Sequence, residues 1–284
     1  MRQAELAFVF PGQGSQAPGM LAALAARHPE VEAAFAEASA GAGVDLWPIA
    51  AGGDPRLDQT EFTQPVLLAA GIAVWRVWQS LGGPAPARLA GHSLGEYTAL
   101  IAAGVLALAD GARLVRERGR LMQAAVPAGA GAMAAVIGAE DAVVAEACRE
   151  ASGDAGDAVV VPANFNSPGQ VVIGGDAAAV ERALAALAER GVRKAVQLPV
   201  SVPSHTPLMR GAAERLAAAM DTVAWQAPAL PVVQNVEARA YQDPAAIRDA
   251  LVRQLYLPVR WTGCVQALAA QGATRIAECG PGKV

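Results

Sequence analysis

A five-residue segment, Gly91-His92-Ser93-Leu94-Gly95, has the pattern Gly-x-Ser-x-Gly. An apolar, strand-like approach at residues 87–90 precedes it, and a helix-like stretch at residues 96–103 follows it. In that setting the pattern is typical of a nucleophile elbow, a strained strand-to-helix turn that exposes the serine hydroxyl. The flanking glycines let the backbone pass close by, and free N–H groups at the helix start can bind a developing oxyanion. Ser93 is therefore the candidate nucleophile.

A serine nucleophile needs a base, and the chain offers His28, His92 and His205. His205 lies in a proline-stiffened loop at residues 202–207 and is the best candidate, although a loop histidine can also simply cap the helix that follows. His92 is adjacent to Ser93, but a neighbour in the elbow points elsewhere. His28 lies at a helix junction and is most simply a solvated surface residue.

A second glycine-rich turn, Phe-Pro-Gly-Gln-Gly-Ser-Gln-Ala at residues 10–17, follows a strand-like segment. Its Gly-x-Gly-x-x-Ala spacing also fits a dinucleotide-binding turn. That fold needs a second strand ending in an acidic residue about 20 residues on, and here residues 29–39 are helical instead. The other interpretation is a sharp turn beside the elbow that presents the Gln13 N–H as an oxyanion donor.

Arg118 lies on a helix-like segment among apolar residues. A lone arginine in that position either extends to solvent or pairs with a surface acid. The functional interpretation is a guanidinium that faces the pocket and binds a carboxylate with two hydrogen bonds.

The composition excludes several classes of function. A net charge of −4, with no basic run longer than Arg193-Lys194, argues against nucleic-acid binding. The longest uncharged run, residues 121–139, is broken by a proline and glycines, so we expect no membrane span. The three cysteines are scattered and lack metal-type spacing, which favours a reducing compartment, no metal and no cofactor. We expect a cytoplasmic protein without an export signal.

The order of the predicted elements indicates an α/β fold. A strand at residues 6–10, several helices, the elbow and a strand at 232–233 predict an α/β-hydrolase-like large domain with a parallel sheet. Residues 131–198 predict the order βαββαβ, which is a ferredoxin-like unit. Glycines at 129–131 and prolines in 199–203 look like paired hinges. We therefore expect a large catalytic domain at 1–128 and 200–284, with a small domain at 129–199 inserted into it.

Six segments taken together resemble one known family: residues 8–16, residues 91–97, Arg118-Gly119, residues 164–170 (Asn-Phe-Asn-Ser-Pro-Gly-Gln), residues 202–205 (Val-Pro-Ser-His) and residues 252–256 (Val-Arg-Gln-Leu-Tyr). In order and spacing they resemble malonyl-CoA:acyl carrier protein transacylases over essentially the whole chain. The family continues past residues 280–284, where this chain stops, so either a C-terminal helix has been trimmed or its absence leaves part of the sheet uncovered.

The resemblance implies an acyltransferase that moves a malonyl group from malonyl-CoA to the phosphopantetheine thiol of acyl carrier protein, for fatty acid synthesis. It implies a malonyl-serine intermediate on Ser93, with His205 as the base. The implied oxyanion donors are the N–H groups of Gln13 and Leu94. The implied substrate-binding residues are Arg118, which would bind the malonyl carboxylate, Asn166, Gln254, whose backbone carbonyl would orient His205, and His92.

Two other functions stay open at this stage. A serine esterase would use the same elbow but would need an acid partner for His205 and no Arg118. A scaffold that only docks carrier proteins would have no use for Ser93. Because acyl carrier proteins are acidic, we expect a locally basic docking face on a monomeric enzyme. The candidates for that face are Arg190, Arg193, Lys194, Arg116 and Arg120.

Overall fold

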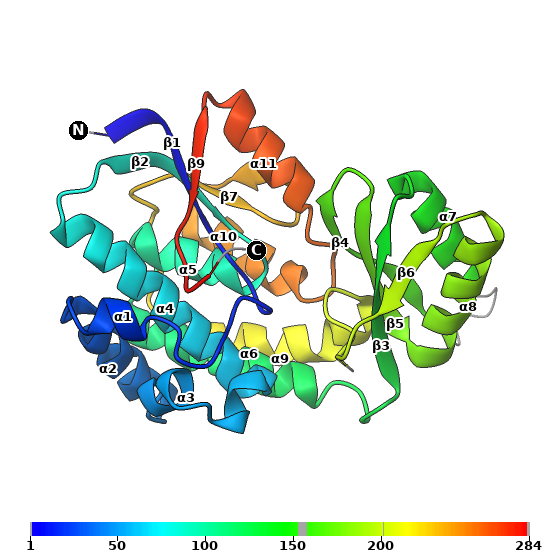
Figure 1. Cartoon of the computed structure of the whole chain (residues 1–284), viewed down its shortest axis with the longest axis horizontal. Helices are drawn as coiled ribbons and strands as arrows, with labels where there is room; N and C mark the ends of the chain where they lie inside the picture. The colour runs from blue at the N-terminus through cyan, green and yellow to red at the C-terminus, as the bar shows by residue number, and fades with distance from the viewer. Residues whose placement is uncertain (1, 153–157, 201, 283–284) are drawn as a thin grey trace.

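The computed structural model describes residues 2–152, 158–200 and 202–282. Within these residues the chain forms two β-sheets that lie side by side, each covered by helices (Figure 1). The larger sheet has the strand order β8-β7-β2-β1-β9, and the smaller sheet has the order β4-β5-β3-β6. The predicted α/β class with two units is therefore confirmed.

Four strands of the larger sheet are parallel: β1 (Arg2–Phe10), β2 (Ala85–Gly91), β7 (Val232–Gln234) and β9 (Arg275–Glu278). The predicted parallel sheet is thus confirmed for these four strands, and the two-residue strand β8 (Arg239–Ala240) adds one antiparallel pair with β7 at its edge. Residues 7–10 of β1 pair in register with residues 88–91 of β2. The two glycine-rich turns that follow these strands therefore both begin at the carboxyl ends of β1 and β2, on the same side of the sheet.

Alternation along the strands divides the interior of the larger unit into two cores. Phe8, Phe10 and Leu89 belong to the main core. Ala7 and Ala90 point to the other face, where they form a smaller cluster with residues of α11 (Trp261–Ala270). The remaining helices of this unit are α1 (Ala22–Ala25), α2 (Glu30–Ala42), α3 (Trp47–Ala51), α4 (Thr60–Ser80), α5 (Leu94–Ala102), α6 (Leu108–Gln123), α9 (Arg210–Met220) and α10 (Pro244–Gln254), with short 3₁₀ helices at Pro55–Asp58 and Pro207–Met209.

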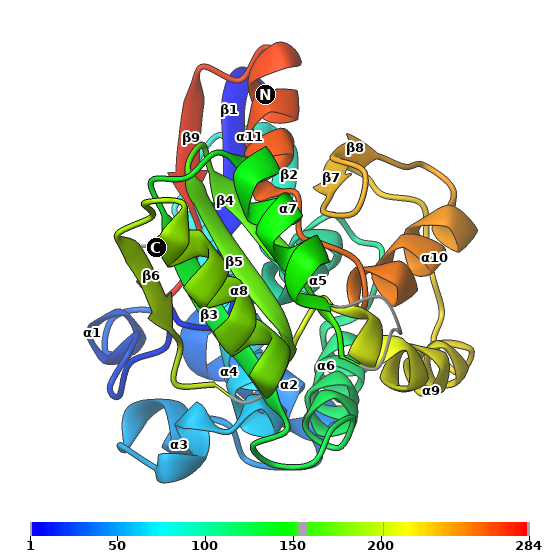
Figure 2. The same ribbon diagram turned by 90° about the vertical axis from the view of Figure 1, so that its right-hand side faces the viewer.

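The smaller sheet has the predicted element order. Its elements are β3 (Gly131–Ile137), α7 (Asp141–Ser152), β4 (Val160–Ser167), β5 (Gln170–Asp176), α8 (Ala177–Glu189) and β6 (Lys194–Gln197). All neighbouring strands are antiparallel, and α7 and α8 pack on one face of the sheet (Figure 2). This is the ferredoxin-like arrangement. The domain limits at 129 and 199 stay predictions, and Ser201 of the second expected hinge lies outside the described residues.

Main-chain hydrogen bonds join the two units beside the elbow. The Phe165 N–H of β4 donates to the Val259 carbonyl at 2.9 Å, and the Val259 N–H donates to the Ala163 carbonyl at 2.9 Å. Thr262 at the start of α11 adds a side-chain bond to the Phe165 carbonyl. One edge of the smaller sheet is thus held against the larger unit at the segment that leads into α11.

Each of the three cysteines is buried in a different apolar cluster. Cys148 belongs to the core of the smaller sheet, Cys264 to the cluster under α11 and Cys279 to the main core. All three are free thiols. Burial raises the pKa of each of them to about 12.

Candidate active site

Ser93 is the residue between β2 and α5, with φ 51° and ψ −105°. A non-glycine residue at positive φ is strained, so the surrounding structure must hold it there. A Cβ atom on Gly91 would lie 1.9 Å from the Gly95 carbonyl oxygen, and one on Gly95 would lie 2.1 Å from the Phe10 carbonyl oxygen. The turn can therefore close only with glycine on both sides of it, which accounts for the spacing of the motif.

His205 lies against Ser93, with 2.8 Å between its Nε2 and the serine Oγ. Its Nδ1 lies 2.6 Å from the backbone carbonyl oxygen of Gln254. A carbonyl can only accept, so Nδ1 carries the proton and Nε2 is free to accept from the serine hydroxyl. Burial, followed by the nearby charge of Arg118, lowers the pKa of His205 to about 3. At neutral pH the imidazole is therefore an uncharged base.

Arg118 on α6 has only 1% of its surface exposed, so it neither extends to solvent nor pairs with a surface acid. Its Nη1 donates to Gln64 Oε1 at 2.8 Å, and its Nη2 donates to Gln254 Oε1 at 2.9 Å. Nη2 also donates to Ser93 Oγ at 3.1 Å. These acceptors are all uncharged, and burial lowers the pKa of Arg118 from its ordinary value. A cation is thus held beside the serine with no carboxylate in hydrogen-bond contact.

Glu96, on the first turn of α5, is a buried acid next to this site. Its Oε2 accepts from the Asn235 N–H at 2.8 Å and from Gln254 Nε2 at 3.1 Å, and its Oε1 accepts from Gln234 Nε2 at 3.0 Å. Burial raises the pKa of Glu96 to about 7, although these donors oppose the rise. Its carboxylate therefore fixes the amide group of Gln254 at close range.

Asn235, the residue directly after β7, completes the support of the elbow. Its Oδ1 accepts from the Ser93 N–H at 2.8 Å, and its Nδ2 donates to the Gly91 carbonyl at 2.7 Å. Both bonds go to the main chain of the strained turn. Asn235 thus holds the turn at two points, on either side of His92.

Sequence reasoning missed three of these buried residues: Gln64, Glu96 and Asn235. A signal existed only for Glu96, because a charged residue directly after the Gly-x-Ser-x-Gly motif interrupts an otherwise apolar helix start. Gln64 and Asn235 lie far from the motif in sequence and reach the site only through packing.

The loop after β1 lies beside the elbow, as the second interpretation of the glycine-rich turn required. The His92 N–H donates to the Phe10 carbonyl at 3.0 Å, which ties the two turns together. Within the part of the chain that the structure describes, neither the Gln13 N–H nor the Leu94 N–H donates to a protein acceptor. The elbow and the loop tied to it therefore each contain a free N–H group, and such groups can stabilise an oxyanion.

His92 and Asn166 meet across the junction of the two units. His92 Nε2 lies 2.9 Å from Asn166 Oδ1, and its ring packs edge-on against Trp261 at a centroid distance of 5.5 Å. The His92 side chain thus points away from Ser93 Oγ, as expected for a neighbour in the elbow. Asn166 on β4 brings the smaller sheet up to the site.

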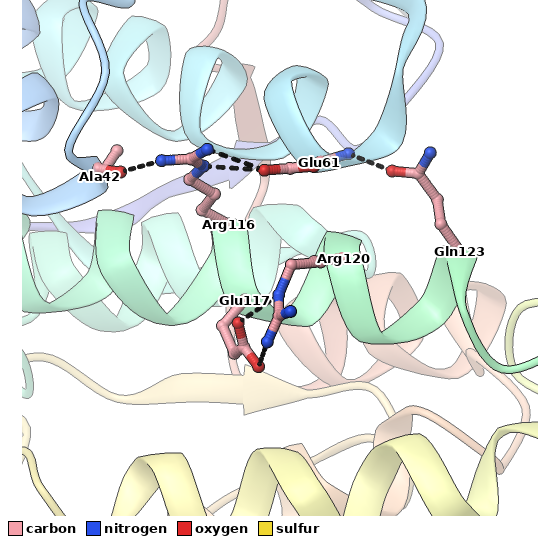
Figure 3. A network of polar contacts seen from close by, with 6 residues as sticks. All are labelled: Ala42, Glu61, Arg116, Glu117, Arg120 and Gln123. Carbon is pink, nitrogen blue, oxygen red and sulfur yellow. Dashed lines mark hydrogen bonds and ion pairs between the residues drawn. The ribbon is translucent and has the colours of Figure 1, made fainter.

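The five basic candidates for a docking face differ in their surroundings. Arg116 donates to Glu61 and to the Ala42 carbonyl, and Arg120 donates to Glu117, so both are already paired (Figure 3). Arg190 pairs with Glu150 at the end of α8. Arg193 and Lys194 are exposed and, among the described residues, make no ion pair.

Among the described residues no group of three or more His, Cys, Asp or Glu side chains is arranged to bind a metal ion. In the same part of the chain, no helix is both long enough and apolar enough to cross a bilayer.

Known proteins resemble this chain in sequence and in fold. Residues 7–281 match the family model described as the acyl transferase domain. The chain belongs to the acyl transferase family. It is 57% identical over 281 residues to the malonyl CoA-acyl carrier protein transacylase of Escherichia coli, and 56% identical to the protein of that name from Salmonella typhimurium. Each match covers 99% of this chain and 90% of the relative.

Solved structures of acyl transferases agree with the fold. A malonyl-CoA:acyl carrier protein transacylase from Xanthomonas oryzae superposes with a TM-score of 0.97 at 71% identity, covering 100% of this chain and 90% of that one. A malonyl-transacylase solved in complex with a type II polyketide acyl carrier protein gives a TM-score of 0.95 at 52% identity, covering 99% of this chain and 90% of that one.

Proposed function

We propose that this acyl transferase moves the malonyl group from malonyl-CoA to the phosphopantetheine thiol of acyl carrier protein and so supplies the extender unit for fatty acid synthesis. The observation that carries this conclusion is the buried Arg118 beside a Ser93–His205 pair. A guanidinium without a carboxylate partner, next to a nucleophile, suits an acyl group with a free acid at its far end. The names of the relatives support the same reaction.

The first half-reaction loads the enzyme. His205 Nε2 takes the proton of Ser93 as Oγ attacks the thioester carbonyl of malonyl-CoA. The tetrahedral oxyanion accepts from the N–H groups of Gln13 and Leu94. The C–S bond then breaks, CoA leaves with the proton from His205, and malonyl-Ser93 remains. Gln254 keeps the imidazole oriented through its backbone carbonyl.

The second half-reaction runs the same steps with a new nucleophile. The phosphopantetheine thiol gives its proton to His205 and attacks the malonyl ester, after which Ser93 leaves and recovers the proton. The uncharged His205 is sufficient for both half-reactions, because the thiol that attacks here, and that leaves in the first half-reaction, needs less proton assistance than an amine would. Asn166 and His92 line the side of the site that faces the smaller sheet, where they contribute to substrate binding.

Arg118 selects the acyl group. A buried cation costs free energy unless it is paired, so a malonyl carboxylate gains an interaction that an acetyl group cannot replace. A buried carboxylate partner for His205 would favour the alternative of a serine hydrolase. The ring instead uses the Gln254 carbonyl, which favours the transferase.

The decisive experiment is incubation with malonyl-CoA alone, followed by intact mass and by release of CoA. We expect about one equivalent of CoA and the mass gain of one malonyl group, because without acceptor the acyl-enzyme accumulates. Ser93→Ala is the control and should gain no mass. Continuous release of CoA would show a hydrolase, and no mass change in the wild-type protein would show a scaffold.

The oligomeric state and the cellular location are expectations separate from the proposed reaction. The reaction as proposed needs a single copy of the chain, since Ser93, His205 and Arg118 all come from it. We keep a monomer in the cytoplasm as the expectation.

A further inference from the structure

The hydrogen bond from Arg118 to Ser93 has a consequence for the proposed malonyl transfer. Nη2 of a guanidinium has two hydrogens. One goes to Gln254 Oε1 at 2.9 Å and the other to Ser93 Oγ at 3.1 Å. Both donor positions of this nitrogen are therefore occupied before any substrate arrives.

A carboxylate can bind a guanidinium with two parallel bonds along two edges. One edge presents Nε with Nη2, and the other presents Nη1 with Nη2. Either edge requires a hydrogen of Nη2, so a doubly bonded carboxylate must displace either Gln254 or Ser93 from Arg118. Nε is not the obstacle, because within the described residues it is buried without a hydrogen-bond partner.

Gln254 is the acceptor that is harder to displace. Its Nε2 donates to Glu96 Oε2 at 3.1 Å and to the Ser93 carbonyl at 3.0 Å. The carbonyl can only accept a hydrogen bond, and so can the Glu96 carboxylate when it is ionised. The amide therefore cannot turn over, and its Oε1 stays directed at Arg118. The Ser93 hydroxyl, in contrast, can leave Arg118 and keep its bond to His205.

We propose that Arg118 restrains the Ser93 hydroxyl in the free enzyme and that the carboxylate of the incoming malonyl group releases it by taking the same N–H. In the restrained state a cation draws on the lone pairs of Oγ, which makes the oxygen a poorer nucleophile. In the released state Oγ donates to His205 and is free to attack. The inference rests on the proposed function and adds a second role for Arg118, in the chemical step.

Charge acts in the same direction at the base. The positive charge of Arg118 opposes protonation of His205, which must accept the serine proton. A bound carboxylate neutralises that charge and strengthens the base. The other titratable groups that face this pair are Glu96, Tyr97 and His92, and none of them lies in hydrogen-bond contact with the His205 ring.

Acylation replaces one bond to the acyl carbon by another. The Ser93 Oγ–C bond forms, the proton of Ser93 moves to His205 Nε2, the C–S bond of the thioester breaks, and the CoA sulfur takes the proton. Arg118 keeps its own protons throughout and exchanges only its acceptor, from Ser93 Oγ to the malonyl carboxylate. The oxygen of an uncharged amide accepts more weakly than a carboxylate and leaves the charge of Arg118 in place, so a neutral acyl donor is slowed in the chemical step as well as in binding.

The test compares malonyl-CoA with malonamyl-CoA, its uncharged amide isostere, in single-turnover acylation of the wild-type enzyme. The readouts are the maximal rate at saturating donor and the half-saturating concentration, both followed by intact mass. We expect the maximal rate with malonamyl-CoA to be lower by about tenfold or more, the value of one charge-assisted hydrogen bond. Equal maximal rates, with only the half-saturating concentration changed, would overturn the inference and leave Arg118 as a binding residue.

Arg118→Gln supplies a second arm, with Arg113→Gln on the same helix as the matched control. The maximal rate with malonamyl-CoA should rise above the wild-type value in Arg118→Gln, and its lower pH midpoint should move up as His205 regains basicity. Arg113 bonds to Asp110 and Thr222 at the surface. Arg113→Gln should therefore change neither the maximal rate nor the pH midpoint. A fold defect in Arg118→Gln would leave the wild-type comparison intact. Absence of any malonyl-Ser93 adduct in the wild type would instead refute the proposed function.

Discussion

Glu96 shows how one residue outside the reacting atoms shapes the site. Its carboxylate is fully buried and is surrounded by the donors of Gln234, Asn235 and Gln254. Its ionised form holds Gln254 in the orientation that Arg118 requires. The same burial raises the pKa of Glu96 to about 7, so the charge is held at a cost in stability.

We expect Glu96→Gln to become more stable relative to the wild type as the pH rises. The ordinary pKa of the carboxyl is 4.5, so below that pH both states are protonated and no penalty exists. Between pH 4.5 and about 7 the unfolded wild type ionises first, which lowers its folding stability relative to the variant by an amount on the order of 3 kcal/mol. Gln234 Oε1, which is buried without a partner in the described structure, can accept from the new amide.

Urea unfolding of both proteins from pH 4.5 to 8 measures this difference in the free energy of unfolding. Exposed Glu214→Gln on α9 serves as the control and should track the wild type at every pH. A stability difference for Glu96→Gln that stays constant over the range would contradict the burial argument.

At the scale of elements, the site depends on how closely α5 approaches the end of β1. The first turn of α5 passes the Phe10 carbonyl so tightly that only hydrogen fits at Gly95. This contact places the loop with Gln13 beside Leu94. The two proposed oxyanion donors are therefore positioned by strand pairing and by one helix contact, and not by their own side chains.

Gly95→Ala should lower the free energy of unfolding by about 3 kcal/mol or more, because its Cβ would meet backbone atoms that cannot move aside. Gly211→Ala is the matched substitution on α9, where a Cβ meets nothing within 4 Å. That exposed helical position should gain about 0.5–1 kcal/mol. Equilibrium unfolding of the two variants is the measurement, and a wild-type midpoint for Gly95→Ala would refute the close approach.

At the scale of the whole molecule, the smaller sheet presents its free edge strand, β6, to solvent. Lys194 begins this strand, Arg193 precedes it, and Val196 within it is 63% exposed. Because Arg116, Arg120 and Arg190 are each paired with an acid, the basic face expected for an acidic carrier protein narrows to Arg193 and Lys194.

Replacing both Arg193 and Lys194 by Glu should weaken transfer to acyl carrier protein and spare loading by malonyl-CoA, because we expect only the carrier protein to contact this face. The two half-reactions are measured separately by mass and by carrier-protein acylation at several salt concentrations. Arg27→Glu with Arg215→Glu makes the same change of charge at two other exposed positions and should affect neither. An equal loss in both half-reactions would place the docking face elsewhere.

Local patterns were enough to predict the elements that carry strong signals. The elbow, the strand before it and the βαββαβ order follow from glycine positions and apolar periodicity within short windows. Helices α10 and α11 were missed, because their apolar residues are spread among small and polar ones and their burial depends on the finished sheet. The role of the Gln254 carbonyl came from family resemblance, since a backbone atom leaves no mark in the sequence. Asn235 was missed for the related reason that its partners are main-chain groups of the elbow.

The distribution of the cysteines gives the molecule a native set of reporters. Each thiol is protonated and shielded in a different apolar cluster, so alkylating reagents can reach it only when that cluster opens. The labelling rate of Cys148 follows opening of the smaller sheet, that of Cys264 follows detachment of α11, and that of Cys279 follows loss of the main core. Peptide-resolved alkylation can therefore tell whether the inserted unit unfolds by itself or only together with its host.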